Sequence, residues 1–214
     1  MITRLKISLI AALLAATPAC VSLFPEPAKA PTIYRLNVGA DLVEKLADTK
    51  VIRVDMPNVP ASLRGPDIAV SPDGRTIAYA EGAKWEAPVP SLLQRAIIEG
   101  FDRSQSIRAV SANTGADSDF LLSIDVREFQ AVFINGAKTA PQASVVMDVV
   151  LVKAGGRTLV GNKLVKAKST ASEYRVERIV IAQEDAMREA INEIVTWSEG
   201  KAKTYVEPQK KRYN

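Results

Sequence analysis

The stretch Leu-Ser-Ile-Asp-Val-Arg at residues 122–127 alternates apolar and polar side chains, which is typical of a strand with one solvated face. The apolar positions then move from even to odd numbers, and we expect a β-bulge near Glu128 to absorb this change of phase. The stretch Ala-Ser-Val-Val-Met-Asp-Val-Val-Leu-Val at residues 143–152 is almost wholly apolar and predicts a central strand. Two consecutive glycines then predict a turn into a third strand that begins at Thr158. These three strands predict an antiparallel meander at the centre of the fold.

Shorter strands are predicted on the N-terminal side of this meander. Asp73 and Gly74 lie between two short runs of β-forming residues. A glycine at that position accepts the positive φ that a tight turn needs, so the sequence predicts a hairpin there. The predicted short strands cover residues 33–38, 51–56, 68–71, 76–79 and 107–110.

Two segments, 89–101 and 181–198, carry apolar side chains at helical spacing. Gly200 follows the second segment at the position where a capping glycine is expected. Short strands, a helix, a meander and a final helix predict a single two-layer α+β domain over residues 33–200. We expect an antiparallel or mixed sheet with the two main helices packed on one face.

Residues 1–19 are typical of a secretory signal peptide, because a positive start is followed by a short apolar run and small residues. The segment 17–20, Thr-Pro-Ala-Cys, resembles a lipobox, in which the cysteine receives a diacylglycerol and becomes the new amino terminus. Cys20 is the only cysteine of the chain, and acylation accounts for a thiol that has no partner for a disulfide. Two alternatives stay open: cleavage after the small residues of segment 28–30, and a buried N-terminal helix.

The two flanks of the predicted domain are polar or rich in proline. Residues 20–32 combine the lipidated cysteine with three prolines and no apolar period, and we expect a flexible tether. Val21 follows the cysteine where an aspartate would favour retention in the inner membrane, so we expect sorting to the outer membrane. Residues 201–214 are basic, and we expect a disordered tail, with contact to anionic lipid headgroups as the alternative.

The composition excludes several classes of function. The chain has 28 basic and 24 acidic residues, a formal charge of +4, and this mild excess indicates no nucleic-acid partner. It has no histidine and no Walker glycine-lysine loop, which excludes Ser-His-Asp triads and an ATPase. With Cys20 assigned to lipid we expect no thiolate metal site, no cofactor and no catalytic residue. A hydrolase that uses the carboxylates Asp125 and Glu128 remains the enzymatic alternative.

Trp85 is the side chain that the sequence singles out. It lies in the segment Lys-Trp-Glu-Ala-Pro at residues 84–88, directly before the first predicted helix. One interpretation places it in the core at the helix entry. The other makes Trp85, Glu86 and Pro88 a candidate partner surface, because aromatic anchors often contribute most of the binding energy of an interface.

Four short motifs follow one another along residues 20–199. They are Tyr-Arg-Leu at 34–36 after the tether, a Pro-Ala-Ser-Leu-Arg stretch at 60–64, the segment 84–88, and Asp-Val-Arg-Glu-Phe at 125–129. Together with the acylated cysteine, their order resembles the ABC-type transport auxiliary lipoprotein component family, whose members are similar to paraquat-inducible protein C.

The resemblance implies a function that composition alone does not. It implies a periplasmic, non-catalytic lipoprotein subunit of an ABC system of the Mce, Mla or Pqi type, which moves lipids between the inner and outer membranes. Its partners would be an Mce-type substrate-binding protein with a permease and ATPase, and assembly into a homo-oligomer is a further implication. The protein would be lipid-anchored in the outer membrane and dock the transport apparatus there. An envelope structural or stress lipoprotein that binds without a transporter is the alternative.

Overall fold

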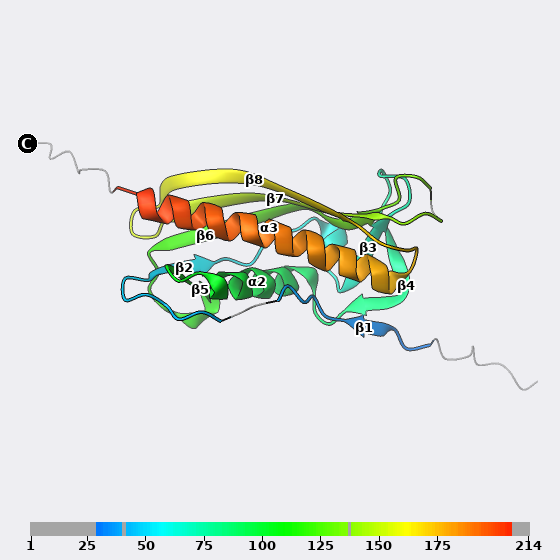
Figure 1. The fold of residues 1–214 in the computed structure, drawn as a ribbon, viewed down its shortest axis with the longest axis horizontal. Helices are drawn as coiled ribbons and strands as arrows, with labels where there is room; N and C mark the ends of the chain where they lie inside the picture. The colour runs from blue at the N-terminus through cyan, green and yellow to red at the C-terminus, as the bar shows by residue number, and fades with distance from the viewer. Residues whose placement is uncertain (1–28, 40–41, 137, 207–214) are drawn as a thin grey trace, which may run out of the picture. The chain divides into compact units, whose positions relative to one another are not determined.

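Eight strands form one mixed sheet in the computed structural model, which describes residues 29–39, 42–136 and 138–206 (Figure 1). In chain order the strands are β1 (Thr32–Tyr34), β2 (Lys50–Val54), β3 (Asp67–Ser71), β4 (Ala78–Trp85), β5 (Ile107–Ser111), β6 (Phe120–Val132), β7 (Gln142–Lys153) and β8 (Thr158–Thr170). The helices are α2 (Val89–Gly100) and α3 (Val176–Thr204), with short 3-10 turns at Ala61–Leu63, Phe101–Arg103 and Ala112–Thr114. The predicted α+β class with a mixed sheet is confirmed.

The three strands of the predicted meander are present. β6 pairs with β7 in antiparallel register along its whole length, and β7 pairs with β8 in the same way. The register shifts between Val126 and Glu128, where the change of phase predicted a bulge. Val126 and Phe129 are both buried, so the bulge keeps apolar side chains on the same face before and after it.

The other edge of β6 is shared by two strands from earlier in the chain. β2 pairs with the start of β6 and β3 with its end, and both pairings are parallel. Between them the backbone of Asn58 forms a bridge: the Val126 N–H donates to its carbonyl at 2.8 Å, and its own N–H donates to the Ile124 carbonyl at 2.9 Å. The long strand β6 therefore joins two smaller groups of strands into one sheet.

The remaining strands extend these two groups outward. β5 pairs with β2 in parallel, β4 pairs with β3 in antiparallel register, and β1 pairs with β4 in parallel. The predicted hairpin between β3 and β4 is confirmed. In its turn, one carboxylate oxygen of Asp73 accepts hydrogen bonds from the backbone N–H groups of Arg75 at 2.8 Å and Thr76 at 2.7 Å. These backbone hydrogen bonds hold the pKa of Asp73 below its usual range.

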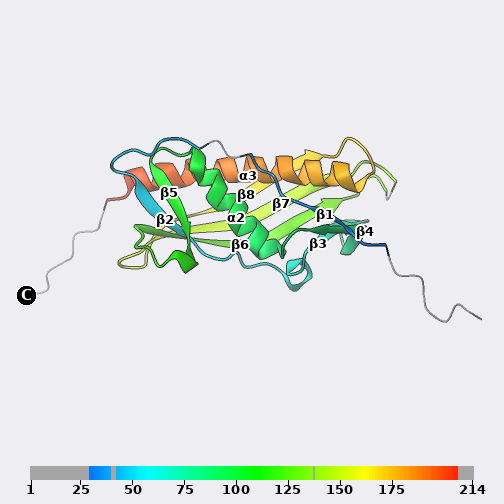
Figure 2. The same ribbon diagram turned by 90° about the horizontal axis from the view of Figure 1, so that it is seen from below.

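Both helices cover one face of the sheet, as predicted (Figures 1 and 2). α3 lies along β7 and β8, while α2 packs on β2 and β5 and crosses α3. At the crossing, a Cβ added to Gly100 would lie only 2.1 Å from the Ile191 Cγ2 atom. The helices therefore approach each other at a place where no side chain fits.

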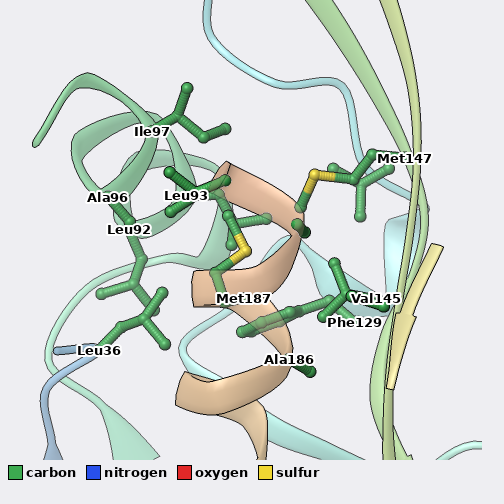
Figure 3. Close-up of a cluster of buried hydrophobic side chains, with 14 of the residues drawn as sticks. Leu36, Leu92, Leu93, Ala96, Ile97, Phe129, Val145, Met147, Ala186 and Met187 are labelled. Carbon is green, nitrogen blue, oxygen red and sulfur yellow. The ribbon is translucent and has the colours of Figure 1, made fainter. Parts of the chain in front are cut away.

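The main core lies where α3 meets both α2 and the sheet. Figure 3 shows Met187 of α3 between Leu92 of α2 on one side and Phe129 and Val145 of the sheet on the other. All four side chains are almost completely buried. On the opposite face of β6 the alternate residues, such as Ser123 and Asp125, are exposed, so the sheet has one covered and one solvated face.

The first strand is shorter than predicted. β1 ends at Tyr34, whereas the sequence predicted a strand over 33–38. It pairs only with Ala83–Trp85, because the chain turns away from the sheet after Trp85 to begin α2. Leu36 and Val38 are buried in the core without belonging to a strand. Thr32, which we had assigned to the tether, belongs to the sheet.

The last helix is longer than predicted at both ends. α3 runs from Val176 to Thr204. Its first and last turns are helical, although polar residues interrupt their apolar pattern. Gly200 lies inside α3, so its prediction as a cap was wrong. Lys201 and Lys203 belong to the last turn, where a positive charge is favourable beside the helix carbonyls, and not to a disordered tail. The predicted signal peptide, Cys20 and the rest of the tail, 207–214, lie outside the described residues.

Candidate partner surface

The segment 84–88 is held by two other parts of the chain. The backbone N–H of Trp85 donates to the carbonyl of Pro66 at 2.7 Å, and the backbone N–H of Glu86 donates to the carbonyl of Tyr34 at 2.8 Å. Val89, the first residue of α2, donates to the carbonyl of Gly65 at 3.2 Å. Strand β1, the loop before β3 and the start of α2 therefore meet at this segment.

Trp85 points into the core. Its side chain is 1% exposed, and its ring centroid lies 5.8 Å from that of Phe129. The alternation of β4 explains the direction, since Ala83 and Trp85 share the buried face while Lys84 and Glu86 are exposed. The interpretation of Trp85 as a core residue at the helix entry therefore holds, and its place in a partner surface is corrected.

Glu86 and Pro88 do lie on the surface. The Glu86 carboxylate forms an ion pair with Arg35 at 3.2 Å and a second, shorter contact with Arg95 of α2. Lys84 pairs with Asp67 nearby, at 3.4 Å. The exposed part of the candidate surface therefore carries a group of charges that are paired within the domain.

Glu128, one of the two carboxylates considered for a hydrolase, and Asp119 bind neighbouring strands of the sheet, whereas Asp125 is exposed. Asp119 accepts a hydrogen bond from the Val51 N–H at 2.9 Å and pairs with Lys153 at 3.6 Å. Glu128 accepts a hydrogen bond from the Ser144 hydroxyl at 2.6 Å. Asp125 is exposed, and its nearest polar partner is the Asn58 amide at 3.4 Å. In the part of the chain that the structure describes, no group of three or more acidic or thiol side chains could hold a metal ion.

A pocket that the sequence did not indicate lies between the β3–β4 hairpin and the start of α3. Its volume is about 360 Å³, and its walls are mostly apolar. The buried residues Val70, Phe133 and Ile179 belong to its lining, while Tyr79 and Tyr174 stand exposed at its rim. Tyr79 belongs to a predicted strand and Tyr174 to the stretch before the last predicted helix, so the sequence does not indicate that the two line one pocket.

Cys20 stays an untested prediction, because it is not among the described residues. Within the described ranges, neither helix combines the length and the apolar character that a membrane span requires.

Comparison with known proteins identifies the family. The sequence model of a family described as "ABC-type transport auxiliary lipoprotein component" matches residues 34–195. No curated protein matches the chain significantly. A solved Xanthomonas campestris protein of the family DUF330 is 21% identical, covers 80% of this chain and 97% of its own, and superposes with a TM-score of 0.70. A second solved protein, described as uncharacterized, is 14% identical over 79% of this chain and 99% of its own, with a TM-score of 0.63. At these identities the two structures show a shared fold.

The family match covers nearly the whole domain. It begins at Tyr34, the last residue of β1, and ends at Val195 in α3, so it includes every strand from β2 to β8. It also covers all four motifs on which the resemblance depended, at 34–36, 60–64, 84–88 and 125–129. The chain therefore belongs to the family of ABC-type transport auxiliary lipoprotein components.

Proposed function

We propose that the protein is a non-catalytic lipoprotein subunit of an ABC system that moves lipids between the inner and outer membranes. Cys20 carries a thioether-linked diacylglycerol, and the domain faces the periplasm from the outer membrane. An Mce-type substrate-binding protein, together with its permease and ATPase, is the partner that it docks.

The family match over residues 34–195 is the observation that carries this proposal, because the family is described as an auxiliary component of ABC-type transport. The lipid cargo and the Mce-type partner extend that description and rest on the order of the sequence motifs. The outer-membrane site rests on that resemblance and on Val21, which follows the cysteine. Of the two carboxylates considered for a hydrolase, Glu128 accepts a hydrogen bond from Ser144 on the neighbouring strand, which supports a function by contact and not by catalysis.

The anchor is tested by labelling cells with a palmitate analogue and comparing the wild type with Cys20→Ser. We expect label on the wild-type protein, recovery of that protein in the outer-membrane fraction, and no label on the variant. A mature protein with an unmodified thiol, or one that begins at Pro31, would contradict the anchor.

The transport role is tested by affinity purification from detergent-solubilised membranes with a tag after Asn214. We expect an Mce-type protein, a permease and an ATPase to be recovered. Recovery of the labelled lipoprotein without any of them contradicts the transport role and supports an envelope lipoprotein that works without a transporter.

The surface around Glu86 and Pro88 is our candidate for the docking contact. Arg35→Glu reverses a charge on a side chain that is 85% exposed, so the fold should be retained while the contact is lost. Lys166→Glu, an exposed position on β8, is the matched control and should leave the purified complex intact. If the two variants recover the partners equally well, the docking surface lies elsewhere on the domain.

A further inference from the structure

Three loops leave the sheet at the same end of its strands. The end of β3 is paired with the end of β6, through Ser71 and Val132. Val132 is also paired with Gln142, the first residue of β7. Gln142 in turn is paired with Thr170, the last residue of β8. The loops that follow these positions therefore lie side by side, and Figures 1 and 2 show the β3–β4 and β6–β7 loops projecting together at the end of the molecule that carries β4. We call residues 72–77, 133–136, 138–141 and 171–175 the loop end.

Each of the three loops exposes a large apolar side chain. Ile77 is 47% exposed, Ile134 is 64% exposed and Tyr174 is 56% exposed. Single exposed apolar residues are ordinary in proteins, but these three lie on neighbouring loops. The Tyr174 ring also packs edge-on against Phe133 at a centroid distance of 5.5 Å, and both line the apolar pocket of about 360 Å³. The loop end therefore presents three exposed apolar side chains, one of which, Tyr174, lines an apolar pocket.

The charges of the loop end favour an anionic surface over a cationic one. It carries three basic side chains, Arg75, Lys138 and Arg175, and two acidic ones. One acid, Asp73, turns its carboxylate toward the backbone of its own loop, and the other, Glu173, pairs with Arg175 at 3.1 Å. Among the described residues no ion pair involves Arg75 or Lys138.

The N-terminal end of β1 also faces this end of the sheet. β4 begins at Ala78, beside the loop end, and β1 runs parallel to it with Thr32 opposite Ala83. Cys20 lies 12 residues before Thr32, and a chain of that length spans at most about 40 Å when fully extended.

We propose that the loop end rests on the surface of a phospholipid bilayer, with Ile77, Ile134 and Tyr174 inserted at the level of the headgroups and Arg75 and Lys138 beside the phosphates. Apolar and aromatic side chains among basic ones have the chemistry that binds such an interface. The inference rests on the proposed anchor at Cys20. A tether of limited length keeps the domain at a high local concentration near the bilayer, so a weak contact is sufficient.

The test uses the mature lipoprotein reconstituted into vesicles of phosphatidylethanolamine and phosphatidylglycerol. Cys20 is the only cysteine, and its acylated sulfur cannot react, so Ile134→Cys introduces a single thiol for an environment-sensitive fluorophore. Leu46→Cys is the matched control, since Leu46 is 57% exposed and lies before β2, at the opposite end of the sheet. Labelling of the wild type would show a free thiol at Cys20, which tests the anchor separately.

We expect the probe at residue 134 to emit at shorter wavelength in vesicles than in detergent-free buffer and to be quenched by lipids with a quencher on the acyl chain. The probe at residue 46 should show neither effect. Equal, solvent-like emission at the two positions, in a protein whose wild type does not label, would overturn the proposal. Protection of residue 134 only after the purified partner complex is added would also overturn it, because the loop end would then contact protein.

Discussion

The helix-covered face of the sheet and the loop end use the same kinds of side chain for opposite purposes. Trp85, Phe129 and Met187 are buried between sheet and helices, while Ile134 and Tyr174 stand in solvent at the end of the strands. By residue type alone, Trp85 leaves a core position and a partner surface both open. The position of a residue in the sheet, on the covered face or beyond the last pairing, decides whether its apolar surface stabilises the fold or is available for contact.

The largest effect that would separate the two regions is expected at Trp85. Trp85→Ala leaves a cavity against Phe129 and should lower the free energy of unfolding by about 3–5 kcal/mol. Urea unfolding followed by circular dichroism measures this, since a second tryptophan, Trp197, complicates fluorescence. A loss below about 1 kcal/mol would mean that the ring is not packed as described.

Two glycine substitutions sharpen the comparison within the helices. Gly100→Ala places a Cβ 2.1 Å from the Ile191 Cγ2 atom, and overpacking at such a site should cost about 1–3 kcal/mol. Gly200→Ala is the matched control, because Gly200 lies in exposed helix with no atom within 4 Å of the added Cβ. It should stabilise the protein by up to about 1 kcal/mol through helix propensity.

A double-mutant cycle identifies the cause of the loss at Gly100. Combined with Ile191→Ala, Gly100→Ala should cost clearly less than it does alone, because the methyl group that it meets is removed. Additive losses in urea unfolding would contradict a direct clash at the helix crossing.

At the loop end the expected change in stability is small. Ile77→Ser combined with Ile134→Ser should alter the free energy of unfolding by only about 0.5 kcal/mol per site, because both side chains are exposed. The same variant should abolish the blue shift of a fluorophore at Tyr174→Cys in vesicles. A large loss of stability would place these residues with the core and remove the contrast between the regions.

The smallest effect concerns Glu184, at the border of the core. Partial burial raises the pKa of its carboxyl above the usual value, although the Asn37 N–H donates to it at 2.8 Å. The folded state therefore binds this proton more tightly than the unfolded state does, and stability falls as pH rises from the ordinary pKa of glutamate through the raised one.

Glu184→Gln cannot ionise but keeps an oxygen for the Asn37 N–H. The variant should gain stability relative to the wild type as the pH rises through that range, in urea unfolding from acid to neutral pH. A difference between the two proteins that stays constant with pH would show that the Glu184 carboxyl is not desolvated.

Local patterns predicted much of this fold. The alternation at 122–127, the bulge near Glu128, the hairpin at Asp73 and the helix that begins at Val89 all depend on residues close together in the chain. The ends of α3 were missed because its outer turns have no clear apolar stripe. From the sequence, Trp85 could lie in the core or on the surface. Alternate residues of the eight-residue strand β4 point to opposite faces of the sheet, and only the tertiary structure shows which face the helices cover.

The sequence by itself determined the periods: which segments are strands or helices, and which side of each is apolar. Only the tertiary structure decided how these pieces share β6, with β2 on one half of its edge and β3 on the other, and which loops therefore meet at one end. A period is a property of neighbouring residues. The parallel pairings of β2 and β3 with β6 join segments more than 60 residues apart, and they are stabilised only when the whole core forms around them.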